Sequence, residues 1–386
     1  MFPASRQSER GAAGPALMIV LVALAAVALW AAVSRQASDP QSEAERPVRL
    51  GAILPLSGDA AEMGRASERG LMLAKEDVAR ELERYAPLRI FVGDSAFDPE
   101  QGSTTAVALL SDEFGVDVLF SSFSYVTAAV NGISADAGIP LFYDSCNCGF
   151  AEENPFAFQV YFDPRKECRS IAEYFERQGV TRGAFIGQDV PYGRYCYEAA
   201  EAVLGEGNVL IELESAGAQK DYEALARSLR AEGVGFVISV PAMNDFKAFL
   251  EANQRSGANL ALACHEGVCL TEELVAEVDP AALENVIAFG FRVSPAFEAR
   301  MRFAHPAMSR QEMMSAAIAY DVARYSAEAS RGCPAGDSRC IVARLEEISL
   351  DDPAIESTGF GEDHILDYAS VYTVFAEGAL APLTLE

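Results

Sequence analysis

From Val48 to the C-terminus, short apolar runs rich in Val, Ile and Phe alternate with amphipathic segments of 12 to 20 residues. This alternation constrains the fold most, because strands separated by helices pair in parallel and need helices on both faces of their sheet. The runs predict strands at residues 49–54, 88–92, 116–120, 140–143, 183–186, 209–213, 235–240, 260–263 and 286–291. The chain is therefore predicted to be an α/β protein built on doubly wound parallel sheets.

Residues 64–84 show the helical half of this pattern. Leu71, Ala74, Val78 and Leu82 recur at three- and four-residue steps, with charged residues between them. Such spacing predicts a helix that packs one apolar face on a sheet. The sequence shows no repeat with a period of 20 to 50 residues, which argues against solenoids and propellers.

An apolar segment precedes this body. Residues 16–33 form a run of 18 apolar residues without a charge, and Arg6 and Arg10 precede it. A helix of this length measures about 27 Å, close to the thickness of a bilayer core. The arginines predict a cytoplasmic N-terminus and export of the rest of the chain to the periplasm. Small residues at 31–34 offer a cleavage site, so a cleaved signal peptide and an uncleaved inner-membrane anchor both remain open. Residues 1–47 are assigned to this signal or anchor and a tether.

Charge and motif content limit the functional classes. The chain carries 30 Lys and Arg against 57 Asp and Glu, a net charge of -27, which argues against nucleic-acid binding. It has 3 histidines, and we find no G-x-S-x-G elbow, P-loop, H-E-x-x-H or G-x-G-x-x-G motif. We therefore expect a protein that is not an enzyme and that needs no cofactor.

The body contains all 8 cysteines of the chain, an even number in a segment predicted to be exported. An oxidising compartment favours a disulfide framework. Cys333 with Cys340, and Cys264 with Cys269, would close short loops, whereas Cys168 and Cys196 fall on consecutive predicted helices.

A soft-metal site is the alternative for some of these cysteines. His265 lies between two of them, and two more, Cys146 and Cys148, occupy another predicted loop. Thiolate and imidazole are ligands for zinc and copper, although this spacing is not that of a zinc motif. We expect disulfides, and no metal ligands are assigned.

Four stretches together resemble type I periplasmic binding proteins, in particular the leucine/isoleucine/valine-binding family and the related amide- and urea-binding receptors. They occur in the order and at the spacing of that family, at residues 50–58, 93–99, 191–194 and 317–322. The resemblance covers nearly all of residues 48–386. It implies two doubly wound lobes joined by a three-crossover hinge, with the ligand in the cleft between them. Lobe 1 would comprise residues 48–161 plus 292–357, and lobe 2 residues 162–291 plus 358–386.

The same resemblance implies a function. The chain would be an exported solute-binding protein that captures a small polar ligand, expected to be an amino acid, and delivers it to the permease of an ABC transporter. Residues 140–143 also resemble the amide- and urea-binding branch, which gives one alternative ligand class. A retained N-terminal anchor would give another alternative, a membrane-tethered ligand sensor.

In lobe 1, hydroxyl groups gather where a predicted strand meets a helix, at Ser122 and Ser124 on either side of Phe123. Free amides at a helix start attract an anion. The resemblance assigns Ser124 to the ligand's carboxylate, although Ser122 or Ser124 could instead only cap the helix. The next loop, with Ser145 and Asn147, corresponds to the second carboxylate-binding turn. Here Asn147 replaces the usual hydroxyl.

In lobe 2, the resemblance assigns Glu266 to the ligand's ammonium group, so that both lobes hold a zwitterion. A surface glutamate in a turn is the alternative reading. Tyr192 and Phe123 could form the cleft wall or pack in the core. Met63 stands where amino-acid receptors of this family often carry an aromatic residue.

Overall fold

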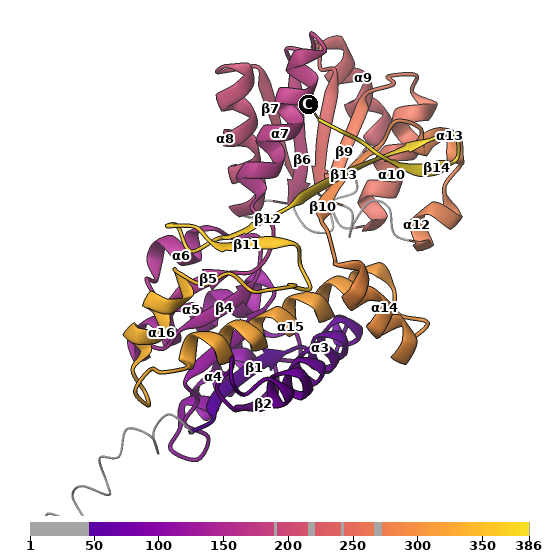
Figure 1. Ribbon diagram of the computed structural model, residues 1–386. Coiled ribbons are helices and arrows are strands. Elements are labelled where there is room, and N and C mark those ends of the chain that lie inside the picture. The colour runs from indigo at the N-terminus through magenta and orange to yellow at the C-terminus, as the bar shows by residue number, and fades with distance from the viewer. Residues whose placement is uncertain (1–45, 189–190, 215–220, 241–242, 266–271, 386) are drawn as a thin grey trace, which may run out of the picture. The chain divides into compact units, whose positions relative to one another are not determined.

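The computed structural model shows two sheets wrapped by helices in the described part of the chain, which comprises residues 46–188, 191–214, 221–240, 243–265 and 272–385 (Figure 1). The predicted apolar helix at 16–33 and the tether lie outside these residues. Among the described helices, none is long and apolar enough to cross a membrane. The sheets and helices below all belong to the body of the chain, which begins at Pro47.

The first sheet has the order β2-β1-β3-β4-β5, and all its neighbours pair in parallel. Its strands are β1 (Val48–Leu54), β2 (Leu88–Asp94), β3 (Val118–Ser122), β4 (Leu141–Asp144) and β5 (Ala157–Gln159). The intervening helices are α3 (Ala61–Arg80), α4 (Pro99–Leu110), α5 (Ser124–Ala137) and α6 (Gly149–Glu153). The chain reverses its direction of winding between β1 and β3, the point at which such sheets open a crevice beyond their carboxyl ends.

The second sheet has the order β14-β13-β10-β9-β8-β6-β7. Its parallel strands are β6 (Gly183–Gln188), β7 (Val209–Glu214), β8 (Phe236–Val240), β9 (Ala261–His265) and β10 (Ile287–Phe291). Its helices are α7 (Pro164–Arg177), α8 (Pro191–Leu204), α9 (Tyr222–Ala231), α10 (Met243–Arg255), α12 (Glu272–Glu277) and α13 (Pro280–Leu283). Two antiparallel strands complete it at one end, β13 (Ser370–Ala376) and, at the edge, β14 (Ala379–Pro382).

After β10 the chain returns to the first sheet through α14 (Pro295–Ala304), α15 (Arg310–Ser330) and α16 (Ser338–Leu345). A two-stranded antiparallel sheet, β11 (Ser357–Phe360) with β12 (Leu366–Tyr368), then leads to β13. Helix α15 lies along α3 (Figure 1). Their backbones approach closely at Gly70, where an added Cβ would lie 2.0 Å from the carbonyl oxygen of Ala316. Only glycine fits this contact.

The α/β architecture with parallel sheets is confirmed, and every predicted strand has a counterpart. The predicted helix at 64–84 is α3, in which Leu71, Ala74 and Val78 are buried. The prediction is wrong for Leu82, which is 53% exposed, because the helix ends at Arg80 and the Glu81 N–H donates to the Val78 carbonyl. The antiparallel strands β13 and β14 were not predicted. The lobe boundaries remain a prediction.

Two predicted cysteine pairs form disulfides: Cys333 bonds to Cys340, and Cys168 on α7 bonds to Cys196 on α8. Cys264 is also disulfide-bonded, and its predicted partner Cys269 lies outside the described residues.

The expected disulfide framework does not extend to Cys146 and Cys148, which are free. Their thiols have different surroundings. Cys146 lines a cavity, whereas the buried Cys148 thiol donates to the Asp163 carboxylate over 3.3 Å.

Candidate functional site

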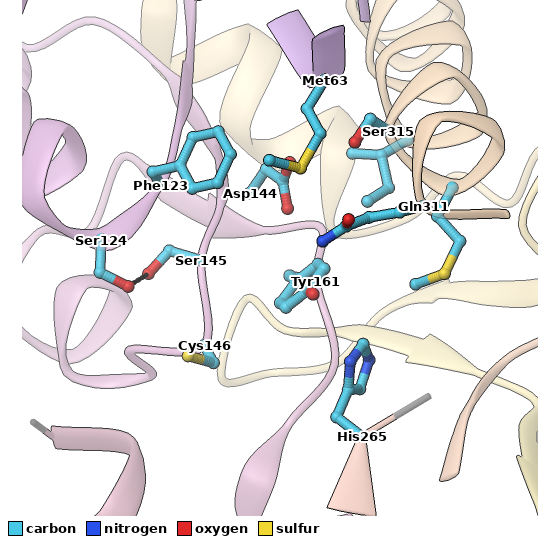
Figure 2. A pocket seen from close by; sticks show the side chains of 12 residues that line it. Met63, Phe123, Ser124, Asp144, Ser145, Cys146, Tyr161, His265, Gln311 and Ser315 are labelled. Atoms are coloured by element: carbon cyan, nitrogen blue, oxygen red, sulfur yellow. Dashed lines mark hydrogen bonds between the residues drawn. The ribbon is translucent and has the colours of Figure 1, made fainter. Parts of the chain in front are cut away.

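A cavity of about 190 Å³ lies beyond the carboxyl ends of β3, β4 and β9 (Figure 2). This is where ligands bind in open parallel sheets. The volume is below the roughly 300 Å³ from which pockets for drug-sized ligands start, so the cavity suits a small solute. The lining residues are Met63, Phe123, Ser124, Asp144, Ser145, Cys146, Tyr161, His265, Gln311, Met314, Ser315 and Ile318.

The connection from β3 to α5 begins with an unusual backbone conformation. Phe123 has φ 69°, a region that residues with a bulky side chain rarely adopt. Its N–H donates to the Asp144 carbonyl over 2.9 Å, which joins the ends of β3 and β4. Its ring packs edge-on against Phe97 with the centroids 5.1 Å apart. Strained residues of this kind persist where the surrounding structure holds them, and they cluster at functional sites.

Two serine hydroxyls meet at the start of α5. The Oγ atoms of Ser124 and Ser145 lie 2.8 Å apart (Figure 2), and the Ser145 Oγ also accepts from the Asn147 N–H over 3.2 Å. Ser124 is the first residue of α5. The first backbone N–H groups of a helix have no partner within it, and the helix dipole favours an anion there. These hydroxyls and amides can donate hydrogen bonds to a carboxylate.

Asp144 contributes a carboxylate to the same cavity. It is the last residue of β4 and lies beside Ser122 of β3 in the register of the sheet. Burial raises the pKa of its side chain to about 7. Within the described residues, no hydrogen bond or ion pair reaches this carboxylate. Asp144 was not predicted as a site residue, although its position directly after a predicted strand and before Ser145 is a usable signal.

His265 lies across the cavity from Met63 (Figure 2). It is the last residue of β9, is 3% exposed and stacks on Phe162 with the ring centroids 4.2 Å apart. Burial, and secondarily the charge of Arg310, lower its pKa to about 3, so the imidazole is neutral at physiological pH. This neutral ring and Tyr161 give the cavity an aromatic wall.

The described residues around His265 do not provide the ligands that the soft-metal hypothesis requires. Cys264 is in a disulfide. In the part of the chain that the structure describes, no group of three His, Cys, Asp or Glu side chains is placed to hold a metal ion.

Helix α15 supplies a third wall that the sequence analysis did not single out. Gln311, Met314, Ser315 and Ile318 all line the cavity. Their spacing of three, four and seven residues places them on one face of the helix. This spacing is visible in the sequence. No local pattern, however, indicates that this face of the helix lies opposite a loop about 190 residues earlier in the chain.

Of the predicted site residues, Met63, Phe123, Ser124 and Ser145 line the cavity. Glu266 lies outside the described residues, so its assignment remains a prediction.

Three further predicted site residues are not among the described lining residues of the cavity. Ser122 is buried at the end of β3, and its hydroxyl has no partner among the described residues. The Asn147 side chain turns back, and its Oδ1 accepts from the Gly149 N–H over 3.2 Å. Tyr192 is 2% exposed and packs on Phe162, as the core-packing alternative expects.

Sequence comparison identifies relatives over most of the body. A family model described as "Periplasmic binding protein" matches residues 47–375. The Leu/Ile/Val-binding protein homolog 7 is 26% identical in Brucella abortus strain 2308 and 25% in Brucella suis biovar 1, over 255 residues in each case. The alignment spans 61% of this chain and 61% of the length of each relative.

Solved structures show the same fold. A putative branched-chain amino acid ABC transporter protein from Silicibacter pomeroyi matches with a TM-score of 0.74 at 16% identity, covering 88% of this chain and 96% of that one. The branched-chain amino acid transporter substrate-binding protein from Streptococcus pneumoniae, in complex with isoleucine, matches with a TM-score of 0.69 at 18% identity, covering 88% and 99%. A solute-binding protein from R. palustris in complex with benzoate matches with a TM-score of 0.68 at 16% identity, covering 88% and 96%.

Proposed function

The chain belongs to the periplasmic binding protein family, and on this basis we propose that it captures an amino acid in the cavity and delivers it to an ABC transporter permease. Similarity to the Brucella Leu/Ile/Val-binding protein homologs and to the isoleucine complex supports this ligand class. Because the benzoate complex has the same fold, the fold alone does not select the ligand. The choice depends on the side chains of the cavity.

The observation that carries the proposal is the Ser124–Ser145 hydroxyl pair at the N-terminus of α5. A pair of hydroxyls that share one hydrogen bond has one further hydrogen to donate. A ligand carboxylate would accept this hydrogen together with the backbone amides of the first turn. We assign the α-carboxylate of the ligand to this place.

The rest of the ligand would lie against the apolar part of the lining, which Met63, Phe123, Met314 and Ile318 provide. Glu266 is proposed as a partner of the ammonium group from the second lobe. The predicted lobes, residues 48–161 plus 292–357 and residues 162–291 plus 358–386, would close on the ligand by a hinge motion. Closure would report occupancy to the permease.

In this proposal the protein binds its ligand in the periplasm and does not convert it chemically. Retention of residues 16–33 as an anchor would keep the body at the inner membrane and would suit a ligand sensor as well as a transporter component.

Isothermal titration of the purified full chain tests the ligand class. Leucine is expected to bind, and leucinamide, which keeps the amine but lacks the carboxylate, is expected to bind at least about tenfold more weakly. Equal affinity for leucine and leucinamide would refute the carboxylate assignment. Binding of urea or acetamide without binding of any amino acid would favour the amide- and urea-binding alternative.

A further inference from the structure

We propose that Asp144 binds a cationic nitrogen of the ligand, so that this cavity selects amine-bearing solutes over purely anionic ones. The inference rests on the proposed function, because it concerns the same cavity. It concerns a different residue from the Ser124–Ser145 pair that would hold the carboxylate, and it would add a contact to the ammonium group beside the one proposed for Glu266, so the carboxylate assignment and this inference can fail separately.

The geometry places the Asp144 carboxylate in the cavity (Figure 2). Figure 2 shows the Asp144 side chain near those of Phe123 and Met63, on the opposite side of the cavity from His265. Ser124 and Gln311 line the same cavity, so a ligand held there shares this space with the Asp144 carboxylate.

No described side chain of the lining neutralises this carboxylate. The described part of the lining contains no Lys or Arg, and its other titratable groups are Cys146, Tyr161 and His265. His265 is uncharged near neutral pH, and burial raises the pKa of Cys146 to about 12, so its thiol stays protonated. Arg310, at the start of α15, acts on His265, whereas burial is the only cause of the raised Asp144 pKa.

A cavity carboxylate that has no counter-charge among the described residues has a simple consequence for the ligand. Ionisation is unfavourable in the empty cavity, because the charge has lost much of its hydration and has gained no partner. A ligand ammonium or amidinium group removes this penalty and forms a charge-assisted hydrogen bond. A ligand that carries only negative charge meets repulsion instead.

The first test uses the empty protein and needs no ligand. Thermal unfolding of the full chain is compared for wild type, Asp144→Asn and Glu62→Gln. Glu62 is the control, since its exposed side chain is next to Met63 in the sequence and loses the same charge. Because the folded-state pKa of Asp144 lies above its ordinary value, ionisation of Asp144 lowers the stability of the wild type increasingly as the pH rises from about 4 to about 7. Asp144→Asn should therefore gain stability relative to wild type over that range, and Glu62→Gln should not. If Asp144→Asn shows no such gain, the carboxylate already has a partner and the proposal is overturned.

The second test compares three probes with the same branched hydrocarbon chain: leucine, which carries an ammonium and a carboxylate, isopentylamine, which lacks the carboxylate, and 4-methylpentanoate, which lacks the ammonium. Asp144→Asn should weaken binding of leucine and isopentylamine at least about tenfold and leave 4-methylpentanoate unchanged or bound more tightly. The proposal is overturned if Asp144→Asn lowers the affinity for all three probes equally. It is also overturned if the wild type binds neither leucine nor isopentylamine.

Ser124→Ala separates this inference from the proposed function. That variant should weaken the binding of leucine and 4-methylpentanoate and leave the binding of isopentylamine unchanged. If Ser124→Ala has no effect on the carboxylates while Asp144→Asn still weakens both amines, the carboxylate assignment fails and the Asp144 inference stands.

Discussion

The hydroxyl oxygens of Ser124 and Ser145 lie 2.8 Å apart, which links the first turn of α5 to the loop after β4. The two residues are separated in sequence by a helix and a strand, and the parallel pairing of β3 with β4 brings their loops together. The contact therefore depends on sheet topology, and it is the structural basis of the predicted carboxylate site.

Ser124→Ala should weaken binding of an amino acid that the wild type binds. The variant loses a hydrogen bond to a charged group, which contributes about 1.5–3 kcal/mol, so the dissociation constant should rise roughly 10- to 100-fold. Titration calorimetry of both proteins measures this directly. Ser103→Ala is the matched control, because the Ser103 hydroxyl on α4 is exposed and bonds only to its own helix, at the Pro99 carbonyl. Loss of affinity in both variants would contradict a specific role for Ser124.

Gly70→Ala should destabilise the body. The added Cβ would lie 2.0 Å from the Ala316 carbonyl oxygen and would force α3 and α15 apart. We expect a loss of about 1–3 kcal/mol in the free energy of unfolding, measured by urea denaturation.

Gly132→Ala is the control for Gly70→Ala. Gly132 lies within α5, and its added Cβ meets nothing within 4 Å. Replacement there should raise stability by about 0.4–1 kcal/mol, because alanine favours the helix and restricts the unfolded chain. Similar effects of the two substitutions would refute the close helix contact at Gly70.

His265 should make stability depend on acid pH. Its folded-state pKa is about 3, below its ordinary value near 6.5, so the unfolded chain takes up a proton before the folded protein does. Its contribution to stability is therefore complete above about pH 6.5 and is lost as the pH falls toward 3. His265→Phe keeps an aromatic ring on Phe162 and should remove this dependence. Urea denaturation of both proteins between about pH 4 and 7 measures the difference, and parallel pH profiles would show that His265 does not titrate in this way.

Cys146 and Cys148 should both react with iodoacetamide in denatured protein that has not been reduced, whereas Cys168, Cys196, Cys333 and Cys340 should react only after reduction. Peptide mass spectrometry distinguishes the two groups. In the folded protein at about pH 8, Cys146 should react slowly, because burial raises its pKa to about 12 and leaves little thiolate. A disulfide between Cys146 and Cys148 in the native protein would contradict the prediction.

The sequence by itself determined the class of fold. Alternating apolar and amphipathic segments are local patterns, and they predicted the parallel strands of both sheets except β5, together with the buried residues Leu71, Ala74 and Val78 of α3. Features that depend on residues close together in the sequence could be predicted as well. Cys333 and Cys340 are 7 residues apart, and Ser124 lies just after the end of β3.

Only the tertiary structure decided which of these local features meet. Gln311 on α15 and Asp144 on β4 line one cavity because the chain returns to the first sheet after β10, and Tyr192 packs against Phe162 in the core. The periodicity of a helix or strand specifies which face is apolar, but it does not specify which distant face will cover it. For the same reason, the environment of a titratable side chain, such as the burial that raises the Asp144 pKa and lowers that of His265, depends on contacts between residues far apart in the sequence.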